Sequence, residues 1–395
     1  MSKEQYEAFP YPARNPKDEA KRLITGSPSH PAEIDTHIYG GRRDWTQPFR
    51  ALVAGGGTGD ALVQLAQVLA SNKVPYEIVY LDLSKAARQI AEARIKERGL
   101  TGVSFHTASL LEAADFGPFD YIDCCGVLHH LDEPQQGLKA LERALKPGGG
   151  IGFMVYAPYG RAGVYPVQEA FQALLPDGTP RERLEAAKQI IKTVPEGHPL
   201  RRNPRVSDHL RDEAGFYDLL LHTRDQAFTA DAWLGELEGA GLALTSWIAP
   251  AIYDLSVIAK VPEGMSAQEA AGVAEKLRGT ITKHVGYAQR AGEVTPALDK
   301  FNASLVPHIQ GPRGDLAKII AAGKDLKVTA QGVNLIMKLP EAAAALIKKA
   351  NGRRSLGEMA QSLNADPMQM QAVWARVHAG FMASGSLRYS SLKPE

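Results

Sequence analysis

A glycine-rich turn interrupts an apolar run near residue 52 of this 395-residue chain, in the sequence LVAGGGTGDAL. Without side chains at Gly55, Gly56, Gly57 and Gly59, the backbone is open to close approach by a flat ligand. The turn stands between an apolar stretch and a helical pattern, which is where parallel α/β sheets bind ligands. The chemistry to expect here is therefore ligand binding by the backbone itself.

The spacing of these glycines argues against a dinucleotide. A G-x-G-x-x-G site needs a third glycine where this chain has Asp60 or, in the shifted frame, Leu62. An acidic side chain at the start of a helix also repels a pyrophosphate. Asp82 ends the next apolar run, and a carboxylate there can accept hydrogen bonds from both hydroxyls of a ribose. Together these residues predict a site for a nucleoside without phosphates.

The elements that position these residues alternate between apolar runs and helical patterns. Ser84 is a suitable N-cap and Gly99 a suitable left-handed C-terminal residue for one of the helices. Such alternation predicts a parallel sheet with helices on both faces. The runs that we interpret as the first five strands are 50–55, 76–83, 103–109, 119–127 and 151–157.

Residues 49–158 resemble the class I S-adenosylmethionine-dependent methyltransferases. FRALVAGGGTGDAL resembles the first motif of that family, VYLDLS the second, and FDYIDCCGVLHHLDEP with LKPGGGIGFMVYAP the fourth and following motifs. The resemblance implies a doubly wound, Rossmann-like α/β fold with a seven-stranded sheet, and S-adenosyl-L-methionine as the cofactor. The donor-binding residues that it implies are Gly55, Gly56, Gly57, Thr58, Gly59, Asp82, Leu83, Ser109, Leu110, Cys125 and Gly126.

The chain departs from the family pattern in three places. The family usually has Asp or Glu where this chain has Val53, so the network around the methionine end of the donor must be supplied differently. The acid that often contacts the adenine amine is replaced by Ser109 and Leu110, with Glu112 as a possible substitute. The Asp-Pro-Pro-Tyr type motif of nucleic-acid amine methyltransferases is absent, which makes base amines an unsuitable target.

Methyl transfer from a sulfonium is an in-line displacement that depends mainly on positioning and on exclusion of water. It requires no metal, and we expect none. The candidate catalytic residues are His129 and His130, which follow the fourth strand, and Tyr159, which follows the fifth. An imidazole is suited to accept a proton from an acceptor. The alternative is that the histidines only pack around the cofactor, and that the tyrosines of this region are core residues.

The rest of the chain suggests four parts. We expect an irregular N-terminal arm with one short helix at 1–48, and a methyltransferase domain at 49–261 with an insertion or lid at 160–228. The last two strands of that domain are predicted within 242–249 and 254–261. Residues 262–338 indicate a helical linker or subdomain. The capped helices of 339–395 resemble a winged-helix regulatory or peptide-recognition domain.

Composition excludes several classes of partner. Hydrophobic residues make up 44% of the chain, and its net charge of +1 creates no field that attracts nucleic acid or an anionic membrane. No segment approaches the ~18 apolar residues of a membrane helix. The adjacent Cys124 and Cys125 rarely bridge in such a position. We expect a cytoplasmic protein without nucleic-acid or membrane partners, whose oligomeric state the sequence leaves open.

These observations favour a methyltransferase that acts on an oxygen or nitrogen of a protein, peptide or small molecule. The winged-helix resemblance favours a peptide or protein slightly. The alternative is a non-catalytic S-adenosylmethionine-binding regulatory protein, which Val53 and the missing adenine-contact acid support.

Overall fold

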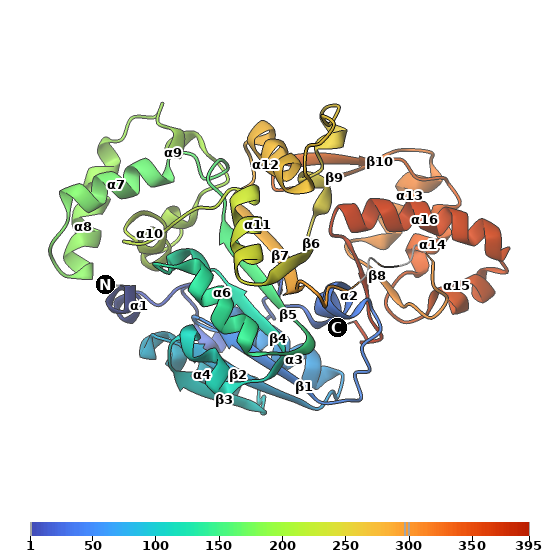
Figure 1. Cartoon of the computed structure of the whole chain (residues 1–395), viewed down its shortest axis with the longest axis horizontal. Helices are drawn as coiled ribbons and strands as arrows, with labels where there is room; N and C mark the ends of the chain where they lie inside the picture. Colours follow the sequence, from blue (N-terminus) through green and yellow to red (C-terminus); the bar gives the residue numbers. More distant parts are fainter. Residues whose placement is uncertain (1, 296–297, 299–300, 395) are drawn as a thin grey trace.

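The computed structural model describes residues 2–295, 298 and 301–394, which fold around a seven-stranded sheet (Figure 1). The strand order is β3-β2-β1-β4-β5-β7-β6. Strands β1 to β5 pair in parallel, whereas β7 runs antiparallel to both of its neighbours. The strands of this sheet are β1 Phe49–Ala54, β2 Tyr76–Asp82, β3 Val103–Thr107, β4 Phe119–Cys125, β5 Leu145–Tyr156, β6 Leu242–Trp247 and β7 Lys283–Arg290.

Helices cover both faces of the sheet and form two further groups at its ends (Figure 1). The α-helices are α1 Ser2–Ala8, α2 Pro31–Tyr39, α3 Asp60–Ser71, α4 Lys85–Glu97, α5 Ala113–Phe116, α6 Pro134–Arg143, α7 Val164–Leu174, α8 Pro180–Ile190, α9 Pro199–Arg202, α10 Glu213–Leu220, α11 Ala230–Gly239, α12 Ala267–Arg278, α13 Arg313–Ala321, α14 Ala343–Lys349, α15 Leu356–Leu363 and α16 Pro367–Ala383. The 3-10 helices are η1 Pro16–Ala20, η2 Leu110–Glu112, η3 Leu128–His130, η4 Ile191–Thr193, η5 Asp208–Leu210, η6 Pro250–Ile252 and η7 Leu255–Val257.

The apolar strands divide their side chains between two cores, as the doubly wound fold requires. In β1, Ala51 and Val53 pack beneath α2, α3 and α4, whereas Leu52 and Ala54 face the core that contains α6 and α11. A fully buried Val or Leu side chain such as Val53 or Leu52 contributes roughly 1.5–3 kcal/mol. The predicted seven-stranded, doubly wound sheet is confirmed. No helix in the described part of the chain is long and apolar enough to cross a membrane.

The position of the last strand differs from the prediction. Residues 254–261 form no strand; they contain η7, and Val257 is 65% exposed. The strand that completes the sheet is instead β7, which lies within 262–338, the stretch that we expected to be helical. The sequence pattern of β7 is hard to recognise because this strand buries polar side chains, which form hydrogen bonds inside the protein. The hydroxyl of Tyr287 donates to the carbonyl of Pro28, and Nε2 of His284 lies 2.8 Å from the carbonyl oxygen of Phe228.

The insertion after β5 is helical and packs as a unit. Helices α7, α8, α9 and α10 gather at one end of the sheet, beside α1 (Figure 1). Their apolar side chains form a separate cluster that also receives Phe9 from the N-terminal arm. The rings of Phe9 and Tyr217 stack with centroids 5.1 Å apart. The insertion and the arm therefore share one core.

The C-terminal part forms a third core, which begins well before residue 339. Leu305, Ile309 and Leu326 pack with residues of α14, α15 and α16. Its strands are β8 Pro307–Ile309, β9 Leu326–Ala330, β10 Val333–Met337 and β11 Leu387–Tyr389. Because β11 pairs with β8, which lies before residue 339, the C-terminal unit is not confined to 339–395, and a winged helix is not confirmed. The prediction that 262–338 is entirely helical is wrong.

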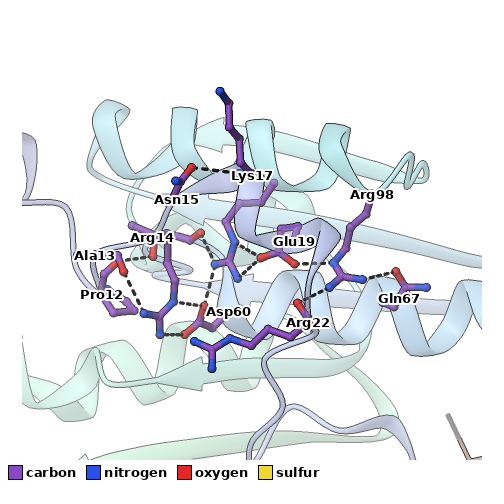
Figure 2. A network of polar contacts seen from close by, with 12 residues as sticks. Pro12, Ala13, Arg14, Asn15, Lys17, Glu19, Arg22, Asp60, Gln67 and Arg98 are labelled. Atoms are coloured by element: carbon purple, nitrogen blue, oxygen red, sulfur yellow. Dashed lines mark hydrogen bonds and ion pairs between the residues drawn. The ribbon is translucent and has the colours of Figure 1, made fainter.

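The N-terminal arm is more ordered than predicted. It contains α1, η1 and α2, and a buried charge cluster fixes it to α3 and α4 (Figure 2). The guanidinium of Arg94, whose side chain is fully buried, donates to Glu19 at 2.6 Å and to Asp60 at 2.7 Å. Arg14 donates to the other oxygen of Asp60 at 2.6 Å, and Arg98 pairs with Glu19. Burial alone raises the pKa of Asp60, but its arginine partners outweigh burial and lower it.

This cluster generates a prediction about stability. Glu19→Gln removes the negative charge that pairs with the buried guanidinium of Arg94. We therefore expect the free energy of unfolding to fall by about 3 kcal/mol. Urea denaturation of the full chain measures the change. The matched control is Asp18→Asn, which removes an exposed pair with Lys21 and is expected to cost less than about 0.5 kcal/mol. Similar effects of the two substitutions would contradict the role of the cluster.

Candidate active site

A cavity of about 450 Å³ opens at the carboxyl ends of β1, β2 and β4. Most of the residues implied by the methyltransferase resemblance line it together. Those in the lining are Gly55, Gly56, Gly57, Asp82, Leu83, Ser109, Leu110, Cys125 and Gly126. Cys125 is a free thiol, as is its buried neighbour Cys124.

The glycine loop has no room for side chains. A Cβ added to Gly56 would lie 2.4 Å from the ring of Tyr80, and one added to Gly57 would lie 2.8 Å from the carbonyl oxygen of Tyr11. Gly57 also has a φ of +51°, which L-residues rarely adopt. The hydroxyl of Tyr80 donates to the carbonyl of Gly57 at 2.6 Å and holds the loop from below.

Asp82 connects the glycine loop to the start of α4. Its Oδ2 accepts from the backbone N–H of Gly57 at 2.8 Å, and its Oδ1 accepts from the N–H of Ser84 at 2.8 Å. Burial raises the pKa of this carboxyl. Because each carboxylate oxygen can accept a second hydrogen bond, Asp82 keeps capacity for the hydroxyls of a ribose.

Two of the predicted donor-binding residues lie outside the cavity lining. The Thr58 side chain turns to the arm, and its hydroxyl donates to the carbonyl of Pro12 at 2.7 Å. Gly59 precedes α3 with a φ of +97°, and a Cβ there would lie 3.0 Å from that of Ala91 in α4. Both residues therefore shape the loop and its packing.

The acid missing at Val53 has a counterpart on the adjacent strand. Asp123 of β4 is the register partner of Val53, and both line the cavity. Burial raises the pKa of Asp123 to about 6, against hydrogen bonds from Ser29 and Tyr121 that lower it. In the sequence, Asp123 lies within the motif FDYIDCCGVLHHLDEP. Only the register of β1 and β4 shows that it is the neighbour of Val53.

Glu112, which we considered as a substitute adenine contact, has a different partner. Its carboxylate accepts from the backbone N–H of Ser109 at 2.9 Å, while the hydroxyl of Ser109 accepts from the N–H of Leu111. These bonds form a capping box that fixes the start of η2. The segment from Ser109 to Leu110 lines the cavity in this fixed conformation.

The three candidate catalytic residues have different surroundings. His130 lines the cavity, whereas His129 is 1% exposed and is not among the lining residues. Tyr159 is 36% exposed and also lies outside the lining. Its neighbour Tyr156 lines the cavity instead.

Several lining residues were not predicted because they come from distant segments. Tyr6 and Tyr11 belong to the arm, and Asp218 belongs to α10 of the insertion. The hydroxyl of Tyr6 donates to Asp218 at 3.1 Å, and burial raises the pKa of Asp218 to about 6. The tyrosines in YEAFPYP were a visible signal, but no local pattern placed them over the sheet.

Comparison with known proteins agrees with this geometry. Residues 52–151 match a family model described as a methyltransferase domain. An uncharacterised protein of Synechococcus sp. is 34% identical over 200 residues, which cover 49% of this chain and 47% of that protein. The ubiquinone/menaquinone biosynthesis C-methyltransferase UbiE of Yersinia enterocolitica is 27% identical over 103 residues, which cover 25% of this chain and 39% of that enzyme. The chain thus spans less than half the length of these curated relatives.

Among solved structures, PKMT2 from Rickettsia typhi has a similar fold. It aligns with a TM-score of 0.64 over 94% of this chain and 78% of its own, at 14% identity. Its complex with AdoHcy, the demethylated form of the donor, aligns with a TM-score of 0.58 over the same shares. Residues 52–151 of the sheet domain thus match the methyltransferase domain family, whose methyl donor is S-adenosylmethionine, and the chain shares the fold of a protein solved with AdoHcy.

The crowded loop generates a prediction about donor binding. Gly56→Ala forces a methyl group against the ring of Tyr80, so the loop must move and the affinity for AdoHcy should fall at least tenfold. Calorimetric titration measures the affinity. Gly292→Ala is the control, because a Cβ at Gly292 meets no atom within 4 Å. Unchanged affinity in the Gly56 variant would show that the loop does not contact the donor.

Proposed function

We propose that this chain is an S-adenosylmethionine-dependent methyltransferase that transfers the methyl group to an amine nitrogen. The observation that carries the proposal is a single cavity lined by the glycine loop, Asp82, and the segment after β4. The cavity of about 450 Å³ is within the usual size of ligand pockets. Small-molecule and peptide amines both fit the proposal, because the winged-helix resemblance no longer favours a peptide.

Three parts of the cavity correspond to the three parts of the donor. Asp82 receives the ribose hydroxyls, and Ser109 with Leu110 lies beside the adenine. Asp123 takes the place of the family acid missing at Val53 and receives the ammonium of the methionine end. This assignment removes the main support for a non-catalytic regulatory protein, since the missing acid is replaced within the same cavity.

The part of the cavity wall that is not assigned to the donor favours an amine as the methyl acceptor. Tyr6, Tyr11 and Tyr156 provide aromatic rings, and Asp218 provides a buried carboxylate beside them. Aromatic faces and a carboxylate attract an ammonium group. His130 completes this wall. An acceptor carrying a negative charge would be repelled by Asp218.

The transfer itself needs little chemical assistance from the protein. The acceptor ammonium first loses a proton, with Asp218 as the proposed nearby carboxylate to accept it. The nitrogen lone pair then forms a bond to the methyl carbon as the carbon–sulfur bond breaks, and sulfur keeps the electron pair. The products are AdoHcy and a methylated amine. The arm and the insertion exclude water from the site and hold the acceptor in line.

The role of Asp123 predicts a pH dependence of donor binding. With a pKa of about 6, the carboxylate is mostly charged at pH 7 and largely protonated at pH 5. The affinity for AdoHcy should therefore fall as the pH is lowered from 7 to 5. Titration of Asp123→Asn should give weaker binding with little pH dependence over this range. An equal pH dependence in both proteins would contradict the assignment.

The acceptor wall predicts a separate effect on transfer. With radiolabelled donor and a host lysate, the wild-type chain should produce label that withstands alkaline treatment, as N-methyl groups do and methyl esters do not. Asp218→Asn should lower kcat/KM at least tenfold while AdoHcy affinity stays within about threefold. Asp208→Asn, a change at a partly exposed residue of the same insertion that pairs with Arg211, serves as control. Alkali-labile label, or full activity of Asp218→Asn, would overturn the amine assignment.

A further inference from the structure

His129 is a buried histidine without a visible partner. Its side chain follows β4 in η3 and is 1% exposed. Neither ring nitrogen has a hydrogen-bond partner among the described residues. A buried polar group left unsatisfied costs about 1–3 kcal/mol. We therefore expect the ring nitrogens of His129 to interact with a ligand from outside the polypeptide.

Two further side chains converge on this position. One ligand atom from each of His129, His130 and Asp225 lies within 4.8 Å of the other two. Asp225 comes from the insertion, and its side chain is fully buried. Its Oδ2 accepts from Arg161 at 3.1 Å and from Gln168 at 3.0 Å. Its Oδ1 has no partner in the part of the chain that the structure describes.

The orientation of His130 leaves a lone pair available. Its Nδ1 lies 2.7 Å from the carbonyl oxygen of Arg224, which can only accept. The neutral ring therefore carries its proton on Nδ1, and Nε2 is free to bind a cation. A backbone carbonyl in this position is the usual support for a metal-bound histidine. Arg161 and Gln168 support the carboxylate of Asp225 in the same manner.

A second set, formed by His130, Asp218 and His222, also lies within 4.8 Å, but it is less suitable. Nδ1 of His222 accepts from the backbone N–H of Arg224 at 3.0 Å. A neutral His222 therefore carries its proton on Nε2, which cannot bind a metal in that form. Asp218 already accepts from Tyr6. In the set with Asp225, each residue offers an acceptor atom that no described hydrogen bond occupies: one ring nitrogen of a neutral His129, Nε2 of His130 and Oδ1 of Asp225.

We propose that His129, Nε2 of His130 and Oδ1 of Asp225 bind a divalent transition-metal ion of the zinc class. Two imidazoles and one carboxylate suit Zn²⁺, whereas Mg²⁺ and Ca²⁺ prefer oxygen ligands. Three protein ligands leave one tetrahedral position for water. The guanidinium of Arg161 stays on the far oxygen of Asp225 and stacks 3.5 Å above the ring of Tyr156, so the carboxylate lies between the two cations.

The consequence of such an ion is a cross-link between two parts of the fold. His129 and His130 belong to the segment that follows β4, whereas Asp225 belongs to the insertion. The ion would fix the insertion to the sheet behind the acceptor wall. Methyl transfer needs no metal, so the ion has a structural role here, contrary to our expectation that the chain binds none.

The test uses the full chain, stripped with a chelator and titrated with Zn²⁺ by calorimetry. We expect one site per chain, and Co²⁺ in its place should give the visible absorption of a tetrahedral complex with nitrogen and oxygen ligands. Asp225→Asn and His129→Gln should each weaken Zn²⁺ binding at least tenfold. His222→Phe keeps an aromatic ring beside His130 but removes the second set, and should bind Zn²⁺ within about threefold of wild type.

Two measurements separate this proposal from misfolding and from the proposed function. AdoHcy titration of each variant reports whether the donor site is intact, and it does not depend on the metal. X-ray absorption of the zinc-loaded wild type counts imidazole ligands without any substitution, and we expect two. Absence of Zn²⁺ binding in wild type, equal binding in Asp225→Asn, or a different imidazole count would overturn the proposal even if methyl transfer is confirmed.

Discussion

The carboxylate of Asp82 makes the interactions on which the proposed donor site depends. It accepts backbone N–H groups from the loop after β1 and from the start of α4, and so joins the ends of two adjacent units of the fold. Because the strands are parallel, these ends meet at one edge of the sheet. The glycine loop, the β4 segment and Asp123 then converge on the same space.

Closure of this space depends on segments that are distant in sequence. The arm lines the proposed donor site and is held by the ion pairs of Glu19 with Arg94 and of Arg14 with Asp60. The insertion supplies Asp218 on the other side and shares a core with Phe9. The open sheet edge thereby becomes a cavity with walls from distant segments, and such walls help to exclude water from a displacement reaction. The same packing creates buried polar groups, among them His129, whose two ring nitrogens have no hydrogen-bond partner among the described residues.

Local patterns predicted the parts of the site that lie directly after strands. The glycine loop and Asp82 were visible because a turn residue or an acid interrupts an apolar run. Asp218 and Tyr6 could not be predicted, because only the tertiary packing of the insertion and the arm brings them to the sheet. Likewise β7 was missed because its buried side chains are polar and are satisfied by residues far away, so its sequence lacks an apolar pattern.

The central claim is that this cavity binds the methyl donor through Asp82. Calorimetric titration of S-adenosylmethionine against wild type and Asp82→Asn tests it most directly. The substitution removes a charge from the proposed bonds to the ribose, and charged hydrogen bonds contribute about 1.5–3 kcal/mol each. We expect one molecule of donor to bind per wild-type chain, and the variant to bind it with an affinity at least tenfold lower. Equal affinities, or no binding to wild type, would contradict this claim.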